Sequence, residues 1–174
     1  MSRAASWFLL VVWSAWLFAL QGLVASTPEL ADWTPELGVV LLLALDPRLD
    51  RSDALLALLI VSAGAIAFSS DPPLAILAGY GAVVFVARSL RSIVEIDQPI
   101  ARALLAGVSA AVLVSYFDLS RSALLASEGL GPVAGGIGGA RVFHAALGTA
   151  LVTLVAAPLV LRLPGMGPLR GGRR

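Results

Sequence analysis

Long apolar runs, separated by short segments that hold nearly every charged residue, constrain the fold of this chain more than any other feature. The first run covers residues 7–24 and would rise roughly 27 Å as an α-helix, close to the thickness of the hydrocarbon core of a bilayer. A backbone in lipid must satisfy its hydrogen bonds internally, which a helix does. We therefore expect an all-α, polytopic helical membrane protein with about six transmembrane helices.

The second apolar run is the shortest. It follows Thr34-Pro35-Glu36, a sequence typical of a helix start because it offers an N-cap, a proline in the first turn and an acidic residue near the positive helix end. Its apolar core, residues 37–45, ends at Asp46-Pro47 and is too short to cross a bilayer unaided. We expect it to cross either by extending back through Trp33 and Leu30 or while packed against other helices in a locally thinned bilayer.

The whole chain, residues 1–174, is expected to form a single membrane domain. The double proline within residues 69–73 is typical of a tight turn, so the third and fourth helices should form an antiparallel hairpin. Arg3 followed by an apolar run is also typical of a signal peptide, but the length of the run and its three tryptophans favour an uncleaved first helix. The expected spans are residues 7–24, 35–46, 54–68, 74–88, 99–117 and 142–161, with an outer glycine-rich loop at 118–141.

The arginines, which are the only basic residues apart from one histidine, predict the orientation. Cytoplasmic loops of membrane proteins are enriched in basic residues. With six spans and a cytoplasmic N-terminus, ten of the twelve arginines fall in cytoplasmic segments, and only Arg121 and Arg141 fall outside. If the second segment does not cross, Arg3 alone changes side. We therefore expect both the N- and the C-terminus to be cytoplasmic. The ten arginines on that side are Arg3, Arg48, Arg51, Arg88, Arg91, Arg102, Arg162, Arg170, Arg173 and Arg174.

Composition narrows the possible chemistry. With 59% hydrophobic and 13% charged residues, a soluble fold would have too few polar side chains to cover its surface, so the surrounding partner is expected to be the lipid bilayer. The absence of cysteine and lysine excludes thiolate metal sites, thiol nucleophiles and Schiff-base cofactors, and the single histidine, His144, cannot form a multi-histidine metal site. A net charge of +1 predicts no nucleic-acid partner. We expect no metal and no cofactor.

One short motif raises the alternative of an intramembrane protease. Gly107-Val108-Ser109-Ala110 resembles the glycine–x–serine–glycine element of the rhomboid proteases, one residue short. His144 lies on a later span, and such enzymes need a serine and a histidine inside the bilayer to form a dyad. Ala103, Gly107 and Ala111 recur at a spacing of four, however, which gives a flat face for close helix packing, and we favour that interpretation. We expect no catalytic residue. The last four runs also have no charged residue at their centres, which argues against an ion-coupled transporter.

Two connecting segments are candidates for binding a partner. Residues 88–102 alternate charged and apolar side chains, as in a segment that lies along the membrane surface, although simple topological anchoring by snorkelling arginines accounts for the same pattern. Residues 120–139 include the glycine-rich stretch, which is typical of a linker and is alternatively a docking surface for an extracytoplasmic partner. The partner-interaction candidates in the first segment are Arg88, Arg91, Glu95 and Asp97.

Several motifs resemble those of the rod-shape-determining MreD family of bacterial inner-membrane proteins. Pro35-Glu36-Leu37 and the leucine-rich stretch after it resemble the short second span of that family. Residues 73–88, which contain Gly79-Tyr80, are similar to the hairpin that follows in the family, and Ala156-Ala157-Pro158-Leu159 is similar to the end of its last span. Ala75 stands where a glycine often follows the proline–leucine pair, and residues 62–68 lack the glycine–leucine–x–aspartate element common in the family.

The resemblance implies a non-enzymatic scaffold of the bacterial cell-shape and peptidoglycan elongation machinery, located in the inner (plasma) membrane. Its implied partners are the membrane protein MreC, the cytoskeletal protein MreB and the peptidoglycan synthases. The implied fold is similar to the membrane-embedded substrate-binding components of energy-coupling-factor transporters. That fold leaves an alternative function, a small-molecule-binding component of a vitamin transporter, which would need an outward cavity lined by polar groups from the second span and the outer loops.

Overall fold

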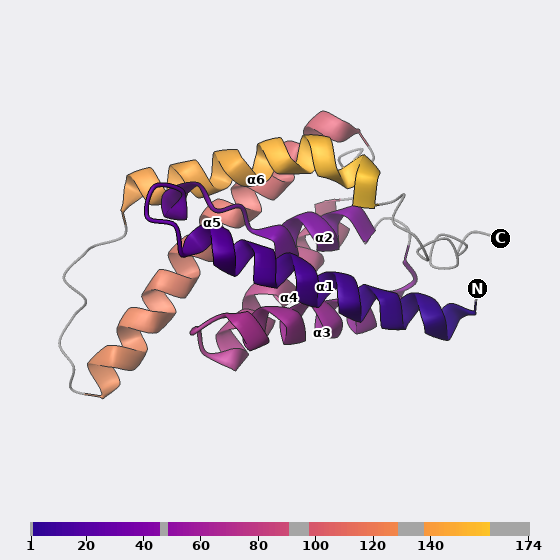
Figure 1. Cartoon of the computed structure of the whole chain (residues 1–174), viewed down its shortest axis with the longest axis horizontal. Helices are drawn as coiled ribbons and strands as arrows, with labels where there is room; N and C mark the ends of the chain where they lie inside the picture. The colour runs from indigo at the N-terminus through magenta and orange to yellow at the C-terminus, as the bar shows by residue number, and fades with distance from the viewer. Residues whose placement is uncertain (1, 46–48, 91–97, 129–137, 161–174) are drawn as a thin grey trace.

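The computed structural model describes residues 2–45, 49–90, 98–128 and 138–160. Within these ranges the chain forms six α-helices and a short 3-10 helix, and it contains no strand, so the predicted all-α fold is confirmed. The helices pack side by side as a bundle (Figure 1). They are α1 (Arg3–Ala25), η1 (Ala31–Trp33), α2 (Leu37–Leu45), α3 (Arg51–Phe68), α4 (Pro73–Leu90), α5 (Pro99–Ser127) and α6 (Gly139–Val160).

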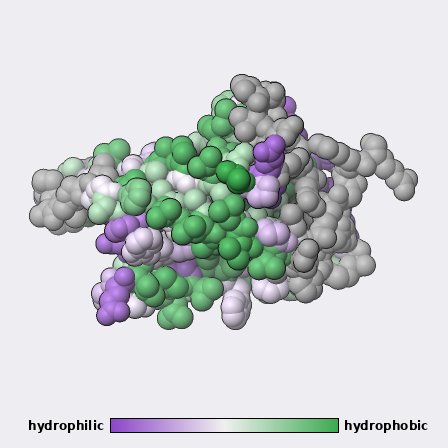
Figure 2. Space-filling view, turned by 90° about the horizontal axis from the view of Figure 1, so that it is seen from above, coloured by the Kyte–Doolittle hydropathy of each residue, from purple (hydrophilic) through white to green (hydrophobic). Residues whose placement is uncertain are grey.

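Five of the helices, α1, α3, α4, α5 and α6, are long and apolar enough to cross a membrane. Their outer faces carry large exposed apolar side chains, among them Phe8 on α1, Phe85 on α4 and Phe143 on α6. Figure 2 shows apolar residues gathered across the middle of one side of the bundle, with hydrophilic residues toward its edges. A surface of this kind suits lipid, since in water such a large apolar patch would be unfavourable. The five long apolar helices are compatible with a multi-pass membrane protein.

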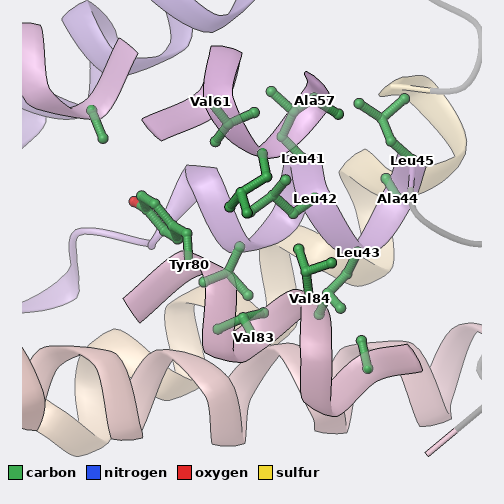
Figure 3. Packing of buried hydrophobic residues seen from close by; sticks show 14 of the residues in the cluster. Leu41, Leu42, Leu43, Ala44, Leu45, Ala57, Val61, Tyr80, Val83 and Val84 are labelled. Carbon is green, nitrogen blue, oxygen red and sulfur yellow. The ribbon is translucent and has the colours of Figure 1, made fainter. Parts of the chain in front are cut away.

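The short helix α2 forms the centre of the bundle. Its nine residues rise roughly 14 Å, too little to cross a bilayer. Every residue from Gly38 to Leu45 is buried, and the helix contacts α1, α3, α4, α5 and α6. A helix that is apolar all round belongs in a core. Figure 3 shows Leu41 and Leu42 of α2 between side chains of α3 and of α4. The packed side chains from these two neighbours include Ala57 and Val61, and Val83 and Val84.

Charged residues lie at the two ends of the bundle. At one end Arg3 pairs with Asp53 and thereby joins the start of α1 to the start of α3. At the other end Arg121 pairs with Asp71 at 2.7 Å, and a second pair at 3.1 Å joins α5 to α6. The start of α1 and the end of α2 lie at the same end (Figure 1). This separation is the arrangement expected of helices that cross a bilayer, because charges avoid the hydrocarbon core.

Two predicted boundaries differ from the structure. The helix α5 continues ten residues beyond the expected end of its span, since residues 118–127 contain neither glycine nor proline and Arg121 is held by Asp71. The first part of the predicted outer loop is therefore helical, whereas its glycine-rich residues 129–137 lie outside the described ranges. Thr34 does not cap α2 as predicted. It closes η1 instead, where its hydroxyl donates to the carbonyl of Leu30 at 3.2 Å.

The predicted close packing at Gly107 is confirmed. A Cβ atom on Gly107 would lie 3.1 Å from the carbonyl oxygen of Ala146 and 3.3 Å from the Cβ of Ala150. The helices α5 and α6 therefore touch almost backbone to backbone at this point. Small residues allow such an approach between helices in a membrane, where van der Waals packing is a main source of helix association.

Candidate functional site

The chain enters α2 through a short irregular segment that other helices hold in place. The backbone N–H of Glu36 donates to Oγ1 of Thr149 at 2.9 Å, and the N–H of Leu37 donates to Oε1 of Gln21 at 3.1 Å. Thr149 belongs to α6 and Gln21 to α1. The first N–H groups of a helix have no partner inside that helix. Thr149 and Gln21 therefore accept the hydrogen bonds that an N-cap residue would otherwise accept. Irregular backbone between membrane helices is tolerated where neighbouring helices satisfy its polar groups in this way.

The irregular segment lies directly on α6. Thr149 is fully buried. Its hydroxyl donates to the carbonyl of Ala145 at 2.7 Å, and the same oxygen accepts the hydrogen bond from the N–H of Glu36. One residue earlier, a Cβ on Gly148 would lie 2.8 Å from the carbonyl oxygen of Trp33. Only glycine leaves room for the backbone of the segment at that position.

The carboxyl group of Glu36 meets Tyr80 of α4. The phenol hydroxyl of Tyr80 donates to Oε2 of Glu36 across a long 3.4 Å contact. Tyr80 itself is buried, with its ring packed edge-on against Phe117 at a centroid distance of 6.3 Å. The ring also covers Gly38, where a Cβ would lie 2.6 Å from the phenol oxygen. The second helix and the fourth are therefore joined at one place by packing and by a polar contact.

Glu36 and Tyr80 line a cavity of about 240 Å³. Its rim contains the exposed residues Asp32 and Ser70, so it opens at the end of the bundle that carries the α3–α4 turn. This is the end that the arginine distribution predicts to be extracytoplasmic. The polar side chains of the lining are Gln21, Asp32, Thr34, Glu36, Ser69, Ser70, Asp71, Tyr80 and Arg141, and its aromatic rings belong to Phe18, Phe68, Tyr80 and Phe117.

Glu36 differs from Asp71 and Arg141, two other charged residues of this cavity, because those two are held in ion pairs. Asp71 pairs with Arg121 at 2.7 Å, and Arg141 at the rim pairs with Asp118 at 3.1 Å. Among the described residues, no cation lies within ion-pairing distance of Glu36. A carboxyl group inside a bundle of apolar helices without an ion-pair partner is costly, and such a group is a candidate for function. Four aromatic rings and the carboxyl group of Glu36, with Asp32 and Asp71 in the same lining, are together suited to bind a small positively charged group.

The position of Glu36 in the cavity was not predicted from the sequence. The sequence pattern indicates Glu36 only as an acidic group near a helix start, and the predicted interaction candidates lie elsewhere in the chain. A signal was nevertheless present, because a carboxyl group at the edge of an apolar run too short to span must follow that run into the bilayer. Of the predicted candidates, Arg88 lies at the opposite end of the bundle, where its Nη2 donates to the carbonyl of Leu49 at 3.1 Å. Arg91, Glu95 and Asp97 lie outside the described residues.

The two residues of the protease alternative have separate surroundings. Ser109 is buried on α5. The ring of His144 stacks on Trp33 at a centroid distance of 4.3 Å. In the part of the chain that the structure describes, no hydrogen bond joins Ser109 to His144, and Nδ1 of His144 has no hydrogen-bond partner. The packing of Gly107 on α6 explains the glycine in that motif without catalysis.

The chain matches no family model, and no curated protein or solved structure matches it. The resemblance to MreD therefore rests on the sequence motifs alone. Two of those motifs, Pro35-Glu36-Leu37 and Gly79-Tyr80, contain the residues that meet beside the cavity.

Proposed function

We propose that this protein is a non-enzymatic scaffold of the cell-shape and peptidoglycan elongation machinery in the bacterial inner membrane. One observation supports the proposal most. The two motif segments that resemble MreD lie 44 residues apart, yet Glu36 of one contacts Tyr80 of the other. The contact brings the two motifs into one structural unit, as we expect if both belong to a shared family fold.

The surfaces of the bundle also suit a scaffold. The helix α2 forms a packed core, and the long helices turn apolar faces outward, with Trp16 exposed on α1 and Val108 and Val112 exposed on α5. Helices of partner proteins can pack on such faces within the lipid. The proposed partners are the membrane protein MreC, the cytoskeletal protein MreB and the peptidoglycan synthases.

Affinity purification tests this function. The tagged full-length chain is expressed in its own host, extracted in mild detergent after brief crosslinking, and its companions are identified by mass spectrometry. We expect enrichment of shape-determining and wall-synthesis proteins over a tagged multi-pass protein of similar abundance. Recovery of an ATPase pair without any wall-synthesis protein would instead contradict the scaffold.

The cavity supports a second function, that of a small-molecule-binding component of a transporter. Its walls come from the segment before α2, from the ends of α1 and α3, from α4 and α5, and from the start of α6, and they include the second segment and outer turns that an outward binding site would require. Its volume of about 240 Å³ is below the range of pockets for drug-sized ligands, so the ligand would be small. The acid and the aromatic rings favour a molecule with a cationic amine. Mass spectrometry of small molecules released from the purified protein tests this function.

A further inference from the structure

A second hollow lies between α3 and α4, at the end of the bundle opposite the cavity. It is an open groove of about 380 Å³. We refer to it as the α3–α4 groove. Its lining consists of Arg51, Ala54, Leu55 and Leu58 from α3 and of Gly81, Val84, Phe85, Arg88 and Ser89 from α4.

The lining residues recur at spacings of three and four along each helix, so each helix contributes one face. Because the two helices are antiparallel, the first lining residues of α3 lie opposite the last lining residues of α4, and the pairs follow one another along the groove. Arg51 and Arg88 lie at the charged end of the bundle, and Leu58 and Gly81 lie deepest toward its middle. The apolar part of the groove covers about two helical turns, or roughly 10 Å. It is thus an apolar trough that ends at two guanidinium groups.

The trough is deep because of one glycine. A Cβ on Gly81 would meet only Cδ2 of Leu58, at 3.9 Å, so a larger side chain there would occupy open space. The floor contains buried residues such as Val84, whereas the rims are exposed: Leu55 by 57% and Phe85 by 72%. Exposed apolar rims on a membrane helix face lipid. The groove therefore opens sideways toward the bilayer.

Both guanidinium groups lie at the charged end of the bundle, where lipid headgroups are expected. Arg51 is the first residue of α3 and is exposed. Arg88 is fixed by its hydrogen bond to the carbonyl of Leu49. Among the described acidic residues near this end, Asp53 pairs with Arg3 and Asp50 precedes α3. Arg88 has a further interaction besides its bond to Leu49. This end is the one predicted to face the cytoplasm, where the leaflet carries anionic lipids.

We propose that the α3–α4 groove binds an anionic phospholipid, with one acyl chain in the trough and the phosphate between Arg51 and Arg88. Guanidinium groups bind phosphate through paired, charge-assisted hydrogen bonds. Basic pockets between membrane helices on the cytoplasmic side are suited to such headgroups. A partner helix fits less well, because it would need an apolar face of several turns, and here the trough ends at two charges after about two turns. This proposal is independent of the scaffold function.

Native mass spectrometry of the full-length protein tests the proposal. The protein is titrated with phosphatidylglycerol or with phosphatidylcholine of the same acyl chains. We expect preferential retention of phosphatidylglycerol, and we expect the double variant Arg51→Gln/Arg88→Gln to lower its retention by roughly tenfold or more, given about 1 kcal/mol for each basic residue near an anionic surface. The matched control, Arg121→Gln/Arg141→Gln, removes the same charge at the opposite end and should retain the lipid.

A second pair of variants separates the contribution of the apolar groove to lipid binding from the contribution of the two arginines. Gly81→Leu fills the groove without touching the arginines and should weaken retention of phosphatidylglycerol, whereas Gly81→Ala adds only a methyl group with an ordinary contact and should not. Thermal unfolding in detergent verifies that each variant is folded. The proposal is overturned if the Arg51/Arg88 variant binds like the wild type, if the control pair loses as much lipid, or if folded Gly81→Leu retains the lipid fully.

Discussion

Gly38 lies so close to Tyr80 that a Cβ atom at position 38 would be 2.6 Å from the phenol oxygen. The absence of a side chain at Gly38 is what allows the first turn of α2 to pass under the ring of Tyr80. The same ring carries the hydroxyl that reaches Glu36. The close approach of Gly38 to Tyr80 therefore positions both the helix α2 and the phenol hydroxyl that contacts Glu36 in the cavity lining.

Substitution of Gly38 by alanine should destabilise the protein by about 1–3 kcal/mol, because the added methyl group must displace a fully packed ring. Gly22 is the matched control. It lies inside α1, and nothing comes within 4 Å of a Cβ placed there, so Gly22→Ala should leave stability unchanged or raise it slightly. Thermal unfolding in detergent measures both variants. Equal melting temperatures for the two would contradict the close approach of Gly38 to Tyr80.

The hydroxyl of Thr149 should contribute more to stability than the hydroxyl of Thr153, although both are buried on α6. Thr149→Val leaves the N–H of Glu36 without an acceptor, which should cost about 1–3 kcal/mol. Thr153 donates only to the carbonyl of Thr149 one turn earlier, so Thr153→Val should cost less. Thr149→Ser keeps the acceptor and should recover most of the loss. Chemical denaturation in mixed micelles ranks the three variants, and a larger loss for Thr153→Val would contradict the capping role.

The five long helices could be predicted from the sequence because each is an apolar run of about the length of a bilayer. The turn between α3 and α4 could be predicted as well, since a double proline after a short polar break ends one helix and begins the next. What these features share is that they depend on local sequence alone. The end of α5 is an exception, since it lies ten residues beyond the predicted end and Arg121 there pairs with the distant Asp71.

The site could not be predicted in the same way. It needs Gln21, Glu36, Tyr80 and Thr149 to meet, and these residues come from four separate segments. In a soluble protein the apolar face of a helix identifies its packed side. In lipid both sides are apolar, so the pattern along α4 or α6 does not tell which face turns toward α2. The position of Glu36 inside the bundle follows only once the burial of α2 is known.

Substitution of Glu36 by glutamine tests whether the carboxyl group serves ligand binding. The change keeps the shape of the side chain and its capacity to accept from Tyr80, and it removes a charge that has no cationic partner among the described residues. Stability should therefore be equal or higher. Retention of a cationic ligand should fall by about tenfold or more, because a hydrogen bond to a charged group contributes roughly 1.5–3 kcal/mol.

The control for Glu36→Gln is Asp32→Asn, which removes a carboxyl group from the exposed rim of the same cavity. Calorimetry with the small molecules released from the purified protein measures both variants. If Glu36→Gln instead destabilises the protein and leaves ligand binding intact, the carboxyl group is structural and the transporter-component proposal loses its main support.

Paired cysteine variants test the orientation of the bundle. Ser70, in the turn before α4, and Ser89, near the end of α4, are both exposed and lie at opposite ends of that helix. The chain has no native cysteine, so each Ser→Cys change creates a single labelling site. Because basic residues mark cytoplasmic segments, a membrane-impermeant maleimide should label Ser70→Cys in intact spheroplasts and Ser89→Cys only after the membrane is opened. The reverse pattern would invert the orientation, and labelling of both sites from outside would show that α4 does not cross.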